Sequence, residues 1–169
     1  MVAQPIIVVM GVSGCGKSTI GVLTAERLGL PYAEGDDFHP TANIQKMAAG
    51  IPLTDQDRAP WLDIVAAWLG DHRVSGGVVA CSALRRAYRD RLRAGAPEAY
   101  FVHLAAGRDE LLRRMAGRHG HFMPTILLDS QLATLEPLEP DEPGVTLDAL
   151  APPSVLVNEA IDAWRADHR

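Results

Sequence analysis

The sequence predicts an α/β protein in which a parallel sheet lies between two layers of helices. Short apolar runs alternate along the chain with segments of helical periodicity. The first run, Ile6–Met10, has no polar residue and lies between Pro5 and Gly11, which is typical of a strand buried on both faces. A glycine-rich turn joins that run directly to a helical segment. Right-handed crossovers between parallel strands then place helices on both faces of the sheet.

The other elements follow from the same two periodicities and from glycine or proline at their ends. After the first strand we expect a turn at 11–16, a helix over Lys17–Leu28, a strand at 30–33, a polar loop at 35–40 and a helix over 42–49. Next come a helix over 60–69 with Pro60 in its first turn, a strand at 77–81, a helix around 88–93 and a strand at 100–104. A helix capped by Asp109, a weak strand at 145–147 and a helix over 154–165 complete the chain. No repeat or linker divides it, so we expect one domain over 1–169.

Composition excludes several functional classes. The 169 residues are 47% hydrophobic and 22% charged, and 16 basic against 21 acidic side chains give a net charge of −5. This balance argues against general binding to nucleic acid or to anionic membranes. The two cysteines do not form a disulfide framework or a C-x-x-C pair, and no apolar run approaches 18 residues. The first ten residues lead us to expect no signal peptide. We therefore expect a cytoplasmic protein.

A phosphate-binding loop follows the first strand. The fixed positions of G-x-x-x-x-G-K-[ST] are matched by the run Gly11, Val12, Ser13, Gly14, Cys15, Gly16, Lys17 and Ser18. Backbone N–H groups of such a loop, with the helix N-terminus behind it, form an anion nest. Lys17 is expected to reach the β- and γ-phosphates and the Ser18 hydroxyl to bind Mg²⁺, with Thr19 as a further nucleotide contact. The sequence therefore predicts a site for ATP and Mg²⁺.

Cys15 lies inside this loop and has two interpretations. A helix N-terminus and a neighbouring lysine stabilise a thiolate, which would make it a reactive thiol. Alternatively, it is a small side chain filling a position where the backbone binds the ligand, and we favour this second interpretation.

The loop occurs in switches, motors and kinases. A GTPase should carry an N/T-K-x-D motif, but neither of the two lysines, Lys17 and Lys46, stands in such a setting. A motor ATPase usually has an acid at the end of an apolar strand, and the best candidate strand, at 77–81, has none. Both absences favour a small-molecule kinase, in which a second substrate supplies the attacking hydroxyl.

The loop at 35–40 is the expected acceptor side. Asp36 or Asp37 could accept a hydroxyl proton and help to hold Mg²⁺, or could simply cap the helix that follows. His39 could contact the substrate or be an ordinary loop histidine. Parallel sheets present their functional loops at the ends of their strands. From the residues alone, the two interpretations of each aspartate remain open, and the ordinary loop interpretation is the commoner one for His39.

Several arginines are candidates for binding anions. Arg58 could grip a carboxylate in a bidentate manner or form a salt bridge with Asp55 or Asp57. The arginine-rich stretch at 85–93 is mostly a solvated face, and Arg89 is the member expected to face the cleft. Arg114 and Arg118 share one helix face and could belong to a lid that covers the phosphates, or be solvated.

These segments together resemble the gluconate kinases. The shared blocks are the phosphate loop, 35–40, 43–47, 50–62, 81–85 and 121–123, in the family's order across most of residues 6–136. The blocks from 35 to 62 are the most specific. The resemblance implies a P-loop kinase fold like that of shikimate and nucleoside monophosphate kinases, with a five-stranded parallel sheet in the order 2-3-1-4-5 and a mobile lid at about 114–136.

The resemblance also implies an activity and its residues. It implies an ATP-dependent kinase that converts D-gluconate to 6-phosphogluconate, and a homodimer. Carried over by position, Lys17, Asp36 and Arg118 are catalytic, Ser18 and Asp36 hold Mg²⁺, and Arg114 joins the phosphate loop in binding the nucleotide. The expected gluconate contacts are Asp36, His39, Arg58, Ser82, Arg89 and His121. We expect adenine to lie near 148–152.

Small departures from the family pattern leave the expected activity intact. Cys15 replaces a more usual serine, and Arg85 stands where lysine is frequent. Fourteen of the 16 basic residues are arginines, and both remaining lysines lie in recognisable blocks. Position 17 requires a compact ammonium that can reach the phosphates, which lysine supplies. Lys46, in the Asn-x-x-Lys-Met block, is therefore expected to have a structural or substrate-side role.

Overall fold

Five parallel strands form the centre of the molecule. A computed structural model describes residues 4–116 and 125–169. In the chain the strands are β1 (Ile6–Met10), β2 (Tyr32–Glu34), β3 (Gly77–Ala80), β4 (Tyr100–Ala105) and β5 (Gly144–Asp148). In the sheet they lie in the order β2-β3-β1-β4-β5, and each neighbouring pair is parallel. The expected fold class and strand order are confirmed.

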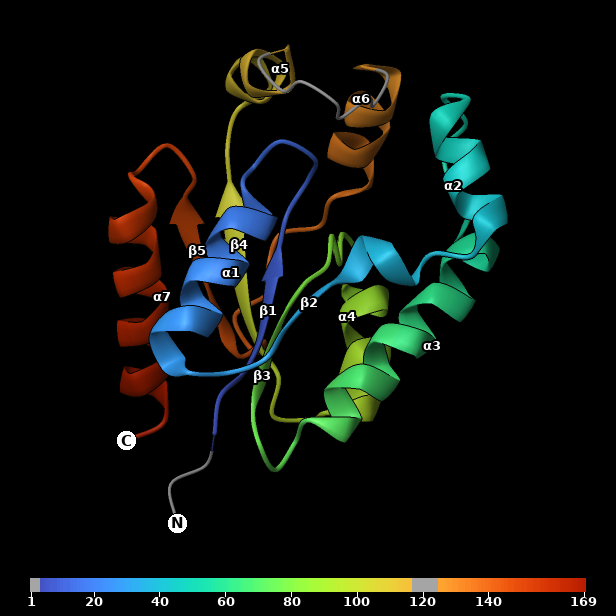
Figure 1. The fold of residues 1–169 in the computed structure, drawn as a ribbon. Coiled ribbons are helices and arrows are strands. Elements are labelled where there is room, and N and C mark those ends of the chain that lie inside the picture. Colours follow the sequence, from blue (N-terminus) through green and yellow to red (C-terminus); the bar gives the residue numbers. More distant parts are fainter. Residues whose placement is uncertain (1–3, 117–124) are drawn as a thin grey trace.

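Helices cover both faces of this sheet. Their bounds are α1 (Lys17–Leu28), α2 (Thr41–Ala48), α3 (Asp55–Asp71), α4 (Arg86–Gly95), α5 (Arg108–Ala116), α6 (Thr125–Thr134) and α7 (Pro153–Asp167). A short 3₁₀ helix, η1 (Gly35–Phe38), follows β2. Figure 1 shows α1 beside α7 on one face of the sheet and α3 beside α4 on the other, while α2, α5 and α6 rise beyond the ends of the strands.

The central strand explains why the sheet forms where it does. Every residue of β1 is buried, with exposed fractions of 0–1%. An unbroken β-branched and apolar run of this kind fits only a strand that has helices on both sides. Parallel strands also present all their C-terminal ends at one edge, and the loops that follow β1, β2 and β3 therefore meet there.

Two elements differ most from the expectation. Among smaller differences, α5 begins at Arg108, which places Asp109 in its first turn rather than at its cap, and the loop expected at 35–40 contains η1. The helix predicted over 60–69 begins five residues earlier, because Thr54 and Asp57 form a capping box that starts α3 at Asp55. Pro60 consequently lies inside the helix rather than in its first turn. The second difference is α6, which the sequence analysis placed in the lid region without identifying a helix.

Candidate active site

Glycines give the P-loop its shape. Gly11, Gly14 and Gly16 have φ values of +146°, +85° and +99°. A Cβ atom at Gly11 would lie 2.7 Å from the Cys15 sulfur and 2.9 Å from the Leu104 carbonyl oxygen, so this position has no room for a side chain. The loop therefore curls tightly over the end of β1, with its backbone close to whatever it binds.

Cys15 is buried beneath this loop. Its exposed fraction is 1%, and its sulfur is the atom nearest to where a Cβ at position 11 would stand. A reactive thiol needs access to a reagent. Burial thus supports the interpretation of Cys15 as a small filler of the loop.

A carboxylate that the sequence analysis missed lies beside the expected metal ligand. The Ser18 hydroxyl donates a hydrogen bond of 2.5 Å to Glu34, and the Tyr32 hydroxyl donates one of 2.7 Å to the same oxygen. Burial, together with the neighbouring Glu34, raises the pKa of Tyr32 and keeps its hydroxyl a donor. The available signal was an acid at the end of β2, two residues before Asp36.

These oxygens suit Mg²⁺. Magnesium in kinases usually takes one or two protein carboxylates or hydroxyls and completes its shell with water and phosphate oxygens. Within the described residues no group of three or more His, Cys, Asp or Glu forms a protein-only metal cage. The hard oxygen donors of Ser18 and Glu34 therefore fit an ion that is shared with the phosphates of a nucleotide.

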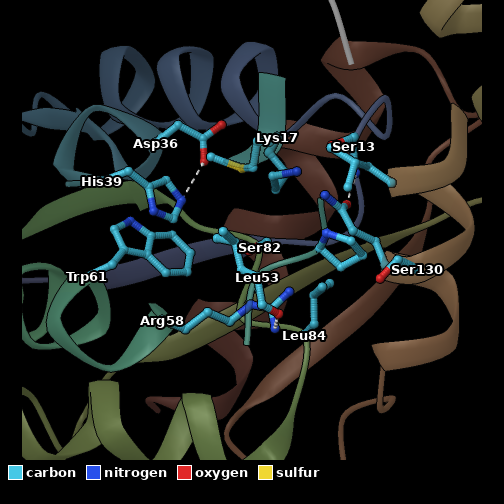
Figure 2. A pocket seen from close by; sticks show the side chains of 14 residues that line it. Ser13, Lys17, Asp36, His39, Leu53, Arg58, Trp61, Ser82, Leu84 and Ser130 are labelled. Carbon is cyan, nitrogen blue, oxygen red and sulfur yellow. Dashed lines mark hydrogen bonds and ion pairs between the residues drawn. The ribbon is translucent and has the colours of Figure 1, made fainter. Parts of the chain in front are cut away.

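A pocket lies where the P-loop meets the loops after β2 and β3, and Figure 2 shows it from close by. We call it the central pocket. It is lined by Ser13, Lys17, Asp36, His39, Met47, Pro52, Leu53, Arg58, Trp61, Ser82, Leu84, Leu127, Ser130 and Gln131. Six predicted residues meet here, namely Ser13, Lys17, Asp36, His39, Arg58 and Ser82. Asp36 lines the pocket and Asp37 does not, which separates the two alternatives.

His39 is held rigidly in the pocket wall. Its ring stacks on Trp61 with a centroid distance of 4.1 Å, and the Trp61 indole N–H donates to the Gly35 carbonyl at 2.7 Å. Burial, and secondarily the charge of Arg58, lowers the pKa of His39 to about 4. The imidazole is therefore neutral at physiological pH.

The tautomer of His39 follows from its neighbour. The Asn43 amide nitrogen donates to the Asp57 carbonyl at 2.9 Å and also lies 3.2 Å from His39 Nδ1. Nδ1 must then be the acceptor, which places the proton on Nε2. Nε2 lies 3.9 Å from an Asp36 oxygen, so the neutral imidazole turns its N–H toward the Asp36 carboxylate (Figure 2).

Arg58 keeps its charge available to a ligand. One of its terminal nitrogens donates to the Leu53 carbonyl at 2.8 Å and to the Tyr88 hydroxyl at 3.2 Å. The guanidinium also lies over the Tyr88 ring, 5.3 Å from its centroid. In the described part of the chain, Asp55 and Asp57 pair with Arg85 and Lys46 instead. Arg58 therefore does not form the alternative salt bridge with Asp55 or Asp57.

Arg89 corrects the prediction that it faces the cleft. It is fully buried away from the central pocket, and its guanidinium donates to Glu142 at 2.7 and 3.0 Å. It also donates to the carbonyls of Ala83 and Pro137. Arg89 instead pairs with the buried carboxylate of Glu142, and the local spacing of 85–93 contains no sign of this distant partner.

A second pocket lies on the other side of the P-loop. We call it the side pocket, and it is lined by Gly14, Cys15, Gly16, Thr19, Ile20, Arg113, Arg114, Ala149, Ala151, Pro153 and Leu156. Arg114 donates to the carbonyls of Ala149 at 2.6 Å and Cys15 at 3.3 Å, which ties α5 to the loop after β5. The side pocket therefore includes part of 148–152, where adenine was expected.

Helix α6 brings three further residues to the central pocket, Leu127, Ser130 and Gln131. The Gln131 side-chain oxygen accepts the Ser13 backbone N–H at 2.8 Å, and Ser130 lines the wall beside it. The contact joins positions 118 residues apart, so no local pattern predicts it. Arg118 and His121, the other expected residues of the lid region, lie outside the described residues.

The two pockets share the P-loop as a common wall. Ser13 and Lys17 face the central pocket, whereas Gly14, Gly16 and Thr19 face the side pocket. A chain of phosphates lying along the loop would connect a nucleoside on one side with an acceptor on the other. This arrangement suits transfer of a phosphoryl group across the P-loop.

Known proteins share both the sequence and the fold. The family model for shikimate kinase matches residues 13–135. A gluconokinase of Gluconobacter oxydans is 47% identical over 95% of this chain and 92% of its own length, and the thermosensitive gluconokinase of Escherichia coli is 44% identical over 82% and 75%. A crystal structure of a gluconokinase from Sinorhizobium meliloti superposes with a TM-score of 0.90 at 45% identity, covering 99% of this chain and 95% of that one. A shikimate kinase from Aquifex aeolicus, 14% identical with a TM-score of 0.61, shares the fold alone.

Proposed function

This chain belongs to the gluconokinases, and on that premise we infer that it transfers the γ-phosphoryl group of ATP to the terminal hydroxyl of D-gluconate. The products are 6-phosphogluconate and ADP. The observation that carries the assignment is the central pocket, in which a P-loop lysine, a carboxylate and an available arginine meet. Gluconate needs all three, because it accepts phosphate through an alcohol and carries a carboxylate of its own.

The nucleotide side of the reaction is assigned to the P-loop and the side pocket. Backbone N–H groups of the P-loop at the N-terminus of α1 hold the phosphates, and Lys17 neutralises charge at their β–γ end. The side pocket, with Arg114 at its edge, receives the adenosine. Arg118, from a lid at about 114–136, would add charge to the transferred group when the site is filled.

The acceptor side is assigned to two opposite regions of the central pocket. Figure 2 shows Arg58 across the pocket from Lys17 and Asp36. An extended six-carbon acid can therefore place its carboxylate at Arg58 and its terminal hydroxyl at Asp36. Asp36 accepts the hydroxyl proton as the oxygen attacks phosphorus, and Ser82, His39 and His121 contact the intervening hydroxyls. The protein contributes mainly alignment and charge neutralisation.

Mg²⁺ fits beside this path. Ser18, Glu34 and Asp36 are the residues that would hold it, directly or through water. When bound, the ion supplies positive charge that neutralises the phosphate oxygens. Tyr32 and Ser18 both donate to Glu34, which fixes the orientation of that carboxylate toward the P-loop.

The assay that tests this function measures ADP release from ATP and Mg²⁺ with a panel of acceptors. Gluconate, shikimate, other sugar acids and nucleoside monophosphates are each supplied at matched concentration. The function predicts rapid turnover with gluconate. Preference for shikimate or a monophosphate would contradict the substrate, and slow hydrolysis that ignores every acceptor would support a nucleotide switch instead.

Two further properties are proposed on the family resemblance. They are a homodimeric assembly and a cytoplasmic location. Within the described residues no helix is both long and apolar enough to cross a bilayer. Light scattering of the purified protein tests the assembly, and cell fractionation tests the location.

A further inference from the structure

Helix α2 contributes to the central pocket but is weakly attached to the molecule by apolar contacts. Asn43 is its one buried residue, and Ile44 on the same helix is 51% exposed. Figure 1 shows α2 at the periphery of the fold, beyond the ends of the strands. Met47 of this helix nevertheless lines the pocket. Since apolar burial is the main term that fixes one element on another, something else must position α2.

Polar contacts from α2 converge on a single residue of α3. Lys46 Nζ lies 2.7 Å from a carboxylate oxygen of Asp57. The Asn43 amide donates to the backbone carbonyl of the same Asp57 at 2.9 Å and lies against His39 Nδ1. Asp57 thus receives one contact through its side chain and another through its backbone, both from α2.

Asp57 also fixes the start of α3. Its carboxylate accepts the Thr54 backbone N–H at 2.9 Å, and its own N–H donates to the Thr54 hydroxyl at 3.1 Å. The hydrogen bond from Lys46, followed by that from the Thr54 backbone, lowers the pKa of Asp57 to about 2, so the carboxylate stays charged at any ordinary pH. The next residue in the chain is Arg58, which faces the pocket. A displacement of Asp57 would therefore be passed directly to the backbone of Arg58.

We propose that Lys46 is a positioning residue for gluconate, because its ion pair with Asp57 holds α2 and the start of α3 in the arrangement that forms the acceptor side of the central pocket. This inference rests on the proposed gluconate kinase function. Lys46 does not line the pocket itself and acts through Asp57, Asn43 and Arg58. The half-buried position of the pair, with 37% and 22% of the two side chains exposed, shields it in part from water.

The ion pair should affect the binding of gluconate and not the binding of ATP. None of its residues lines the side pocket or belongs to the P-loop. Loss of Lys46 should therefore change how gluconate binds and leave ATP binding as it was. A merely structural role would instead lower overall stability and move both substrates together.

Steady-state kinetics of Lys46→Ala and Lys46→Met test the proposal, with KM measured separately for gluconate and ATP. We expect KM for gluconate to rise at least about fivefold, while KM for ATP and kcat change by less than about twofold. Lys46→Arg keeps the charge and should recover most of the gluconate affinity. The control is Arg73→Ala, which breaks an ion pair of the same 2.7 Å length between Arg73 and Glu98 at the surface, away from both pockets.

Three results would overturn the proposal. They are an unchanged KM for gluconate in Lys46→Ala, equal rises in both KM values, or an effect no larger than that of Arg73→Ala. Should the alanine variant fail to fold, Lys46→Arg and Lys46→Met are compared instead by the shift in melting temperature that gluconate induces. Wild-type protein without gluconate turnover would refute the proposed function itself, whereas active wild type with unaffected variants would refute the role of Lys46 alone.

Discussion

Lys17 is the residue whose role is most sharply defined. Its ammonium donates to the Val12 carbonyl at 3.1 Å, which holds it over the P-loop and on the side of the central pocket. Lys17→Ala should lower kcat/KM, with a loss of about 2–3 kcal/mol of transition-state stabilisation. This is the usual cost of removing one preorganised electrostatic contact. Lys17→Arg should recover little, because a planar fork does not match the point charge needed there. Near-normal kcat/KM in the alanine variant would contradict the phosphate assignment.

Asp36 and Asp37 provide an internal comparison. Both belong to η1, but only Asp36 lines the pocket. Asp36→Asn should reduce kcat far more than it raises KM for gluconate, since the amide cannot accept the hydroxyl proton. Asp37→Asn is the matched control and should remain close to wild type. If Asp36→Asn changed KM alone, Asp36 would bind substrate without acting as the base.

His39 makes the stability of the protein depend on pH. Its folded-state pKa of about 4 lies below the ordinary value of 6.5, because burial disfavours the imidazolium. The unfolded chain therefore takes up a proton between those values that the folded chain does not, and stability falls as pH drops from about 6.5 to 4. The contribution lost is about 2–3 kcal/mol.

Chemical denaturation of wild type and His39→Gln between pH 7 and pH 4 measures this contribution. The variant should lose less stability than wild type over that range. His72→Gln is the control, because His72 also stacks on a tryptophan but lies only half-buried. Parallel stability curves for wild type and His39→Gln would contradict the assignment.

Residue types were predictable from the sequence where a role requires one chemistry. Lys17, Ser18 and Asp36 were predicted because phosphate or hydroxyl chemistry calls for those residue types. Lys17 and Asp36 line the central pocket, and Gly14, Cys15, Gly16 and Thr19 line the side pocket. The prediction that Arg89 faces the cleft failed because an arginine suits a buried ion pair as well as it suits a ligand. Its partner Glu142 lies 53 residues downstream, beyond the reach of any local pattern.

At the scale of elements, the Arg89–Glu142 pair anchors α4 to the segment before β5. Both side chains are fully buried, and Arg93 donates to the same carboxylate. Glu142→Ala should destabilise the fold by about 3–5 kcal/mol, because it leaves buried guanidinium groups without a counter-charge. Asp141→Ala, which removes an exposed carboxylate immediately before Glu142 in the chain, should cost under about 1 kcal/mol. Equal losses in urea denaturation would show that the buried pair is not the anchor.

Element boundaries were predictable where their end signals are local. Gly29 ends α1 where expected, in a left-handed conformation that accommodates glycine best. Pro60 alone predicts a helix start at position 60, but Thr54 followed by Asp57 three residues later is the stronger signal and starts α3 at Asp55. Helix α6 was missed because its apolar residues form no clear stripe, and its contacts are with distant residues such as Ser13 of the P-loop and Arg108 of α5.

The fold of the whole molecule was predictable in two steps. Alternating strands and helices predicted an α/β fold with parallel crossovers, whereas the strand order β2-β3-β1-β4-β5 was predicted only through the resemblance to the gluconate kinases. The gathering of loops at one edge of a parallel sheet then brings the P-loop, η1 and the loop after β3 together. The contribution of α6 to that edge depends on packing across the full chain, which no local pattern contains.

The central claim is that these loops direct one phosphoryl group to the terminal hydroxyl of gluconate. The most direct test is proton-coupled ³¹P NMR of the product formed by the purified protein from ATP, Mg²⁺ and D-gluconate. A phosphate ester on a primary alcohol couples to the two protons of its CH₂ group, so we predict a triplet that grows in step with ADP. A doublet would show transfer to a secondary hydroxyl, and inorganic phosphate alone would show hydrolysis; either result would contradict the account.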